Sequence, residues 1–531
     1  MKFPDRPAAI DRLRGTRVVD VLIVGGGING AGLLRELALN GVDALLVDKS
    51  DFASGATSAS SRMIHGGLRY LENGEFRLVR ESLHERNRLL KNASHAVKPL
   101  PTTIPIFSRW SGFTNALGKF IRLTDRPSQR GAALIKIGLT LYDLLTWRKR
   151  VLPRHCFTRR AAALAERPAL HPDIVCTATY YDAWIPLPER LCLELVDDAL
   201  ALHAGVQALN YVAAIGVANG AVELRDEITG DCYTVVPRIV ANAAGAWIDF
   251  ANAALGATSR LIGGTKGSHL VVEHPELFSA TAGEQLFYEN EDGRVCIFFP
   301  LHGRVLVGST DLRIENPDDA MCDDAEIDYL LESVQTVFPD IRVGREHIVS
   351  RFCGVRPLPA SEGGFTGRIS RDHSCRDLAP APPERPWPVH ALVGGKWTTF
   401  RAFAEQVADK IFAELGRQRR ANSRDLAIGG RTQELDYADD SALEQIMKSE
   451  AVVRLDDLLL RRTPLALFGM LDSARFDAIA ALAAHTLGWD AARLQSETGR
   501  TRSLFAQRHG IHFPPVSQSS CPTPTTPTKS A

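Results

Sequence analysis

Three glycines near the start of the chain have the spacing of a phosphate-binding turn. Gly25, Gly27 and Gly30 form the pattern G-x-G-x-x-G between a β-branched apolar run at 18–24 and a helical pattern at 31–40. Glycines at these positions permit a tight turn and let backbone N–H groups and a helix N-terminus approach a pyrophosphate. The pattern also occurs in ordinary tight turns, but its flanking elements here favour a dinucleotide site.

The sequence after this turn favours FAD over NAD as the dinucleotide. A second apolar run at 42–47 ends at Asp48, whose carboxylate can accept hydrogen bonds from an adenosine ribose. A hydroxyl-rich stretch at 57–61 and a His-Gly-Gly sequence at 65–67 follow, where the second half of a bulky cofactor must lie. The alternative interpretation of this stretch is a polar surface loop, because Ser-rich loops are common.

Two later apolar runs, at 235–241 and 389–393, also end in small residues and are typical of strands in the same sheet. The expected fold class is therefore α/β or α+β, with a Rossmann-like FAD-binding domain built from discontinuous segments, an inserted substrate domain with a mixed or antiparallel sheet, and a small C-terminal helical domain. The expected divisions are 17–95, 195–255 and 345–415 for the FAD-binding domain, 96–194 and 256–344 for the substrate domain, and 430–513 for the helical domain.

The C-terminal part of the chain is helical in pattern. The segments 442–447, 452–460 and 476–487 carry apolar residues at a spacing of three to four. Beyond Phe513 the content of Pro, Ser and Thr rises, which predicts a disordered tail at 514–531.

The overall composition excludes several classes of protein. The 62 basic and 62 acidic residues cancel, so no global field attracts nucleic acid. Nine cysteines include no C-x-x-C pair, which predicts reduced thiols and no structural metal. The charged stretch 1–17 lacks the apolar region of a secretory signal, and no apolar stretch approaches the length of a spanning helix. We expect a cytoplasmic protein that can still lie on a membrane surface.

The glycine turn is the first of several sequence blocks that occur in a fixed order. The blocks are Gly25–Gly32, Ala56–Arg62, His65–Glu72, Lys266–His269, Gly308–Asp311, Gly354–Leu358 and Gly394–Arg401, followed by Asp456–Leu458 and Arg461–Thr463. Together they resemble the signature of the FAD-dependent, aerobic-type glycerol-3-phosphate dehydrogenases. The chain is similar to a divergent member of that family.

The resemblance implies which residues carry out the reaction. It places His65, Arg69, Arg356 and Lys396 at the reactive side of the flavin as catalytic residues. Oxidation of a secondary alcohol needs a base for the hydroxyl proton while hydride passes to flavin N5. His65 is the first candidate, because an unperturbed histidine pKa near ~6.5 suits proton removal near neutrality. Lys396 is the alternative base, or a cation that stabilises the reduced flavin.

The resemblance and the motifs together define two sets of binding residues. Guanidinium groups can bind phosphate oxygens in bidentate fashion, which favours arginines in the substrate set. The substrate set is Arg69, Tyr70, Lys266, His269, Arg356 and Arg371. The FAD set is Gly25, Gly27, Asn29, Gly30, Asp48, Thr57, Ser58, Ser60, Gly66, Gly67, Ala244, Gly245, Gly395, Lys396, Thr398 and Thr399.

The implied activity is the oxidation of sn-glycerol 3-phosphate, or a related polyol phosphate, to a ketone such as dihydroxyacetone phosphate, with electrons passed from FAD to quinone. One segment departs from the family pattern: the run Tyr181–Leu191 lacks the usual paired acids, has one extra residue and contains two prolines. An erythritol-phosphate dehydrogenase is therefore a serious alternative. Further alternatives are an FAD-dependent 2-hydroxy acid or amino acid dehydrogenase, a non-catalytic flavoprotein and an NAD-linked enzyme.

The segment Arg109–Arg154 is basic, with ten cations against two acids and several interspersed aromatic and aliphatic residues. Such a segment can rest on anionic lipid and bring the protein close to quinone at the cytoplasmic face of the inner membrane. A solvated basic face is an equally good interpretation. The sequence leaves the oligomeric state open.

Overall fold

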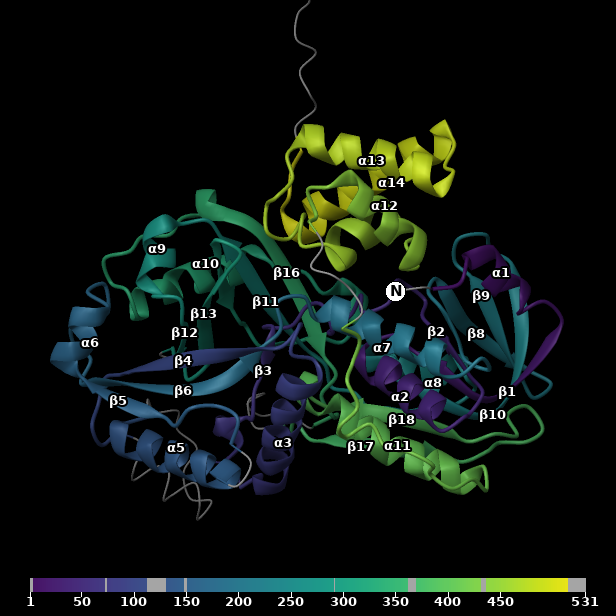
Figure 1. The fold of residues 1–531 in the computed structure, drawn as a ribbon, viewed down its shortest axis with the longest axis horizontal. Coiled ribbons are helices and arrows are strands. Elements are labelled where there is room, and N and C mark those ends of the chain that lie inside the picture. Colours follow the sequence, from purple (N-terminus) through teal and green to yellow (C-terminus); the bar gives the residue numbers. More distant parts are fainter. Residues whose placement is uncertain are drawn as a thin grey trace, which may run out of the picture.

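A computed structural model describes residues 3–71, 74–111, 130–147, 150–290, 292–361, 369–430 and 436–513 of the chain. It contains two sheets with helices around them and a separate group of C-terminal helices (Figure 1). The predicted mixed α/β fold class is thereby confirmed. The expected tail at 514–531 and the stretch 112–129 of the basic segment lie outside the described residues.

The first sheet is built around β1, whose second half is buried because apolar side chains point to both faces. β1 pairs in parallel with β10 on one side and β2 on the other, while β18 joins β10 and β7 joins β2, also in parallel. The four predicted strands are confirmed, with slightly shifted ends. The strands are β1 (Thr16–Val24), β2 (Ala44–Val47), β7 (Gln207–Leu209), β8 (Val212–Ala218), β9 (Ala221–Asp226), β10 (Cys232–Asn242), β17 (His373–Leu378) and β18 (Val389–Gly394).

Helices cover this sheet and hold the carboxyl ends of its parallel strands in place. α2 follows the glycine turn and packs between α7 and α11, where Leu33, Leu37 and Phe403 belong to one fully buried core (Figure 1). The helical elements of this part are α1 (Arg6–Asp11), α2 (Ile28–Leu39), α3 (Phe76–Asn92), α7 (Pro188–Leu202), η3 (Gly245–Trp247), α8 (Ile248–Ala254), η8 (Trp397–Thr399) and α11 (Phe400–Glu414).

The second sheet is mostly antiparallel, as predicted for the substrate region. Its strands are β3 (Met63–Ile64), β4 (Lys98–Ile106), β5 (Cys156–Arg159), β6 (Cys176–Trp184), β11 (Thr265–Val272), β12 (Gln285–Glu289), β13 (Val295–Leu301), β14 (Arg304–Gly308), β15 (Leu312–Arg313) and β16 (Ile348–Arg356). β16 pairs with β11 along its whole length, so it belongs to this sheet, although the sequence placed 345–415 with the FAD-binding segments. The division into domains stays a prediction.

Short helices surround the second sheet. They are η1 (Leu68–Leu71), α5 (Ala132–Thr146), α6 (Arg160–Glu166), α9 (Pro275–Ala280), η4 (Pro317–Asp319), α10 (Asp324–Ser333), η5 (Val334–Thr336) and η6 (Arg345–His347). α3 and α5 lie beside β6 and carry buried side chains that face the sheet.

The C-terminal unit consists of residues 436–513 and has its own apolar core. Its elements are α12 (Asp440–Ser449), η9 (Asp457–Arg462), α13 (Ser473–Leu487), α14 (Ala491–Leu504) and η10 (Phe505–His509). The predicted helix at 452–460 is wrong in its start. The helical residues begin at Leu455, just before η9, and the carboxylate of Asp457 accepts hydrogen bonds from the backbone N–H groups of the preceding Val453 and Arg454, at 2.9 and 2.8 Å.

Among the described residues, no helix combines the length and the apolar character needed to cross a bilayer. The cysteines of the described part are unpaired. Cys375, Asp377 and His390 bring possible metal ligand atoms within 4.8 Å of one another. Asp377 also pairs with Lys410, and both ring nitrogens of His390 contact carboxylates, so this cluster is satisfied by its own charges.

Candidate cofactor and active site

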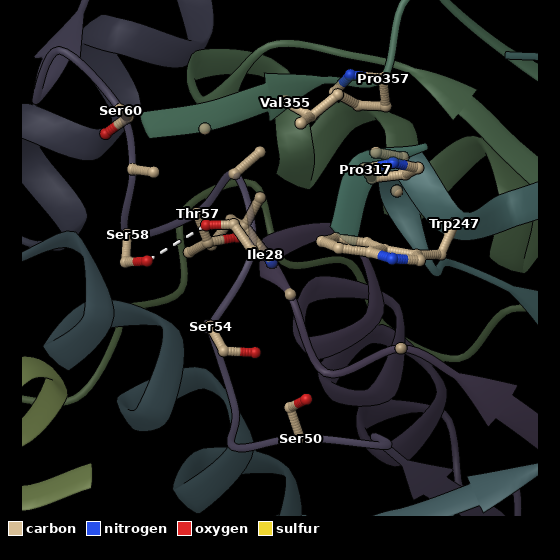
Figure 2. Close-up of a pocket in the computed structure, with 18 of the residues that line it drawn as sticks. Ile28, Ser50, Ser54, Thr57, Ser58, Ser60, Trp247, Pro317, Val355 and Pro357 are labelled. Atoms are coloured by element: carbon tan, nitrogen blue, oxygen red, sulfur yellow. Dashed lines mark hydrogen bonds between the residues drawn. The ribbon is translucent and has the colours of Figure 1, made fainter. Parts of the chain in front are cut away.

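A large cavity of about 880 Å³ lies where the carboxyl ends of the first sheet meet the second sheet and the C-terminal unit. Such a position, at the ends of parallel strands, is where open α/β sheets bind nucleotides. Figure 2 shows Ser54, Ser58 and Ser60 along one side of the cavity, with Trp247 and Val355 on the other. The cavity therefore has a polar wall and an apolar wall.

The glycine turn and Asp48 form one end of this cavity. The Asp48 carboxylate accepts hydrogen bonds from the backbone N–H groups of Gly26, at 2.7 Å, and Ser50, at 2.8 Å. Burial raises the pKa of Asp48 to about 6. Ala244 and Gly245, which follow β10, line the same end. The residues predicted for the adenosine and pyrophosphate are thus brought together.

The hydroxyl-rich loop is held against the glycine turn by its own side chains. Thr57 Oγ1 accepts a hydrogen bond from the N–H of Ile28 at 3.0 Å, at the first residue of α2. The Trp397 indole donates to the carbonyl oxygen of Thr57 at 3.3 Å. Ser58 donates to the carbonyl oxygen of Gly55 at 3.1 Å. Distant segments at 57 and 397 therefore meet beside the start of α2.

The cavity lining contains buried polar atoms that have no partner in the described chain. Asn29 Oδ1 and His269 Nδ1 are both of this kind, and both residues line the cavity. Buried polar groups are normally hydrogen-bonded, so these two atoms indicate a polar ligand. Together with the glycine turn and Asp48, they fit the chemistry of a dinucleotide such as FAD.

The close packing of the glycine turn leads to a first prediction. A Cβ added at Gly30 would overlap the carbonyl oxygen of Gly25, so the turn would have to open. We expect Gly30→Ala to lose most of its FAD, and the absorbance of the purified protein at flavin wavelengths measures this. Gly499→Ala in α14 is the control, because its Cβ would meet nothing within 4 Å. Equal flavin content in both variants would contradict the prediction.

Three residues of the predicted reactive site meet at the other end of the cavity. The Lys396 ammonium lies 4.2 Å from the centre of the Tyr70 ring, and the rings of His65 and Tyr70 are 6.2 Å apart. Lys396 Nζ donates to Ser82 Oγ at 3.0 Å. His65 and Lys396 come from segments more than 300 residues apart, so only the fold brings them together.

At this end of the cavity, buried charges make Lys396 rather than His65 the group that titrates near neutrality. Burial, followed by the positive charges of Lys396 and Arg371, lowers the pKa of His65 to about 3. Burial lowers the pKa of Lys396 to about 7. The expectation that His65 titrates near neutrality is therefore wrong. Lys396 is the group with a pKa suited to proton transfer at neutral pH.

Two arginines flank a carboxylate on the same side of the cavity. Arg356 contacts Asp311 at 3.0 Å and Ser309 at 2.9 Å, while Arg371 lies 3.7 Å from the other oxygen of Asp311. Asp311 thus holds two guanidinium groups near each other. Since both arginines line the cavity, they can present N–H groups to an anion.

The structure does not bring every predicted residue to the cavity wall. Lys266 pairs with Asp323 at 2.8 Å and Glu326 at 2.7 Å, and it is not among the lining residues. Arg69 lies in η1, but its side chain is outside the described part of the structure. The residues that pack behind the wall instead of lining it are Gly30, Gly66, Gly67 and Thr399.

The segment that departs from the family pattern contributes one residue to the cavity lining. Within 184–190, Glu189 alone lines the cavity, and it pairs with buried Arg62 at 3.4 Å. Arg62 also donates to the carbonyl oxygen of Pro186. Trp184 pairs with Met63 in the second sheet, so the start of this segment lies beside the strand β3 that leads to His65.

Sequence reasoning missed the contribution of the C-terminal unit to the cavity. Arg454, Arg461, Arg500, Arg508 and His509 all line it. The paired acids and arginines at 456–462 were the available signal, since charged pairs in an apolar helical pattern often mark a buried contact. Their position beside the cavity could not be read from the sequence.

Comparison with known proteins identifies the class to which this fold and site belong. The family model for FAD dependent oxidoreductases matches residues 20–409. A solved glycerol-3-phosphate dehydrogenase from Bacillus halodurans, complexed with FAD, has a TM-score of 0.71 at 19% identity and covers 94% of this chain and 96% of its own. The chain belongs to the FAD dependent oxidoreductase family, and the predicted cofactor, FAD, is confirmed.

The most informative relatives within this family act on polyol phosphates by name. A glycerol-3-phosphate dehydrogenase of Synechocystis is 36% identical over 416 residues, which is 75% of this chain and 70% of that protein. The aerobic glycerol-3-phosphate dehydrogenase of Escherichia coli is 33% identical, covering 74% and 73%. A D-erythritol 1-phosphate dehydrogenase of Brucella abortus is 34% identical, covering 75% of each. The resemblance found in the sequence is confirmed.

Proposed function

We propose that this enzyme oxidises sn-glycerol 3-phosphate at its secondary hydroxyl and passes the electrons from FAD to quinone. One observation carries this proposal. The arginine pair around Asp311 lines the same cavity as His65 and Lys396, so an anion-binding group lies beside a candidate base. A small substrate with a phosphate at one end and a hydroxyl nearby fits this arrangement.

Each residue of the site has a task in the proposed reaction. Arg356 and Arg371 bind the phosphate and fix the orientation of the substrate, because guanidinium groups match phosphate oxygens in bidentate fashion. Lys396, whose pKa is about 7, accepts the hydroxyl proton. His65 stays neutral and provides a hydrogen-bonding ring nitrogen. When bound, FAD supplies the hydride acceptor.

D-erythritol 1-phosphate is the second candidate substrate, because a named D-erythritol 1-phosphate dehydrogenase is about as similar to this chain as the glycerol-phosphate enzymes are. An arginine pair also binds carboxylates, so a 2-hydroxy acid is the third candidate substrate.

Anaerobic reduction of the bound flavin distinguishes these substrates. The purified protein is mixed with glycerol 3-phosphate, erythritol phosphate, lactate and 2-hydroxyglutarate, and flavin absorbance is followed. We expect bleaching with glycerol 3-phosphate at the highest rate. Faster bleaching with erythritol phosphate would make erythritol phosphate the preferred substrate. Bleaching only with the hydroxy acids would overturn the proposal. Absence of bleaching with every compound would favour a non-catalytic flavoprotein.

An exposed apolar face on α5 supports peripheral contact with a membrane, where quinone resides. Ile137, Leu141 and Leu144 are exposed along one side of this helix, and Trp110 and Trp147 are exposed near its ends. Lys136 on this helix is exposed, as are Arg109 and Arg154 in the flanking segments. Apolar side chains flanked by cations and tryptophans suit an anionic lipid surface. The proposed location is therefore the cytoplasmic face of the inner membrane.

Sedimentation with vesicles tests the role of this face. We expect the intact protein to pellet with phosphatidylserine-containing vesicles and to be released by salt, since lipid attraction to cations is screened. The triple variant Ile137→Ser, Leu141→Ser, Leu144→Ser should remain in the supernatant. Ile215→Ser, an exposed apolar residue on β8, is the matched control. If the triple variant and the control pellet equally, the proposed membrane contact of α5 is wrong.

A further inference from the structure

A buried carboxylate lies directly behind the turn that carries His65. Asp182, on β6, is 1% exposed, and its Oδ1 accepts three hydrogen bonds. The donors are the backbone N–H of Gly66 at 3.1 Å, the Tyr142 hydroxyl at 2.6 Å and Arg86 Nη1 at 2.8 Å. Three separate elements, α3, α5 and the 65–67 turn, are therefore tied to one oxygen atom.

The 65–67 turn is confined between this carboxylate and Lys396. A Cβ added at Gly66 would overlap the Tyr142 hydroxyl, and one added at Gly67 would lie 2.6 Å from Lys396 Nζ. The N–H of Gly66 also donates to the Tyr142 hydroxyl at 3.0 Å. On the other side, Thr398 Oγ1 donates to the carbonyl oxygen of His65 at 3.2 Å. The turn has little freedom to move.

The same carboxylate acts on Lys396 through space. Burial lowers the pKa of Lys396, and among the neighbouring charges that oppose this effect Asp182 is the largest, followed by Glu75. Arg371 acts in the opposite direction and Asp372 in the same direction as Asp182. A negative charge behind the turn therefore stabilises a proton on Lys396.

We infer that Asp182 is a positioning residue for the reaction: it holds the His65–Gly67 turn in place through the N–H of Gly66 and stabilises the ammonium that forms when Lys396 takes up a proton. Arg86 and Tyr142 fix the carboxylate in turn, since both donate to the same oxygen. This inference rests on the proposed function for the role of Lys396, but the part that concerns the turn does not depend on any substrate.

Hydrogen exchange of the FAD-loaded protein tests the positioning role without substrate. In Asp182→Asn the Gly66 N–H keeps only an uncharged amide oxygen in place of a carboxylate, and in Tyr142→Phe it loses one of its two acceptors. In both variants, the peptide that contains Gly66 should exchange its amide hydrogens about tenfold faster or more. The matched control is Asp198→Asn, which removes another buried carboxylate paired with an arginine, Arg35, at 2.9 Å. Unchanged exchange at this peptide in Asp182→Asn or, should that variant not fold, in Tyr142→Phe would overturn the inference.

The pH dependence of flavin reduction by glycerol 3-phosphate tests the electrostatic role. In Asp182→Asn, we expect the midpoint near neutrality to move to lower pH by about one unit, because a neighbouring negative charge raises a lysine pKa by roughly this amount. Asp198→Asn should keep the wild-type midpoint. A midpoint unchanged in Asp182→Asn contradicts the electrostatic role. If wild type is not reduced by any polyol phosphate, the proposed function fails, while the exchange experiment still decides the positioning role.

Discussion

Replacing Lys396 by methionine should slow flavin reduction by glycerol 3-phosphate about 100- to 10,000-fold, the usual contribution of a positioned acid or base. We expect so large a loss of rate because Lys396 is buried at the reactive end of the cavity and has a pKa of about 7. A base must be neutral to accept a proton. The wild-type rate should therefore rise with pH up to about 7 and level off above it, and Lys396→Met should lose this bend.

His65→Asn is the matched comparison for Lys396→Met. Because the pKa of His65 is lowered to about 3, its charge does not change between pH 5 and 9, and the bend near neutrality should persist in this variant. Anaerobic stopped-flow traces over that pH range, with flavin content measured for each protein, provide the test. If His65→Asn loses the bend while Lys396→Met keeps it, the base is His65 and the assignment of Lys396 is wrong.

The local strands and turns could be predicted from the sequence, but the protonation states of the buried site residues could not. The glycine turn, the strand ending at Asp48 and the later strands could be predicted because each depends on a short pattern of residue types. The basicity of His65 could not, because its pKa depends on burial and on Lys396 and Arg371, which the fold brings from distant segments. Protonation in a buried site is a property of tertiary packing.

The same difference explains the assignment of Lys266 and the later helical start at Leu455. Lys266 belongs to a block that resembles the family, but its partners Asp323 and Glu326 lie in a capping box at the start of α10. The apolar spacing at 452–460 is compatible with a helix, yet the carboxylate of Asp457 binds the N–H groups of Val453 and Arg454, and the helix begins only at Leu455. Side-chain hydrogen bonds, which periodicity does not record, decided both outcomes.

Asp51→Asn should destabilise the docking of the C-terminal unit by about 3–5 kcal/mol, the usual cost of removing one partner from a buried ion pair. Asp51 follows β2 and is fully buried, and it contacts Arg461 at 2.6 Å and Arg462 at 2.7 Å. Burial alone would raise its pKa, but Arg462 and then Arg461 reverse this effect and lower it. A lowered pKa means that the stabilisation is present at neutral pH and is lost only in acid, as the carboxyl becomes protonated in the folded state.

The consequence of Asp51→Asn should extend to the cofactor, because Arg461 and other residues of the C-terminal unit line the cavity. We expect this variant to release FAD at a lower temperature than wild type and to be cleaved by protease within 436–513, as followed by flavin fluorescence and mass spectrometry. Arg475→Ala is the control within the same unit, because its pair with Asp440 is half-exposed and such pairs contribute at most about 1 kcal/mol. If both variants retain FAD equally, the C-terminal unit is not needed to close the cavity, and the buried charges serve only to attach it.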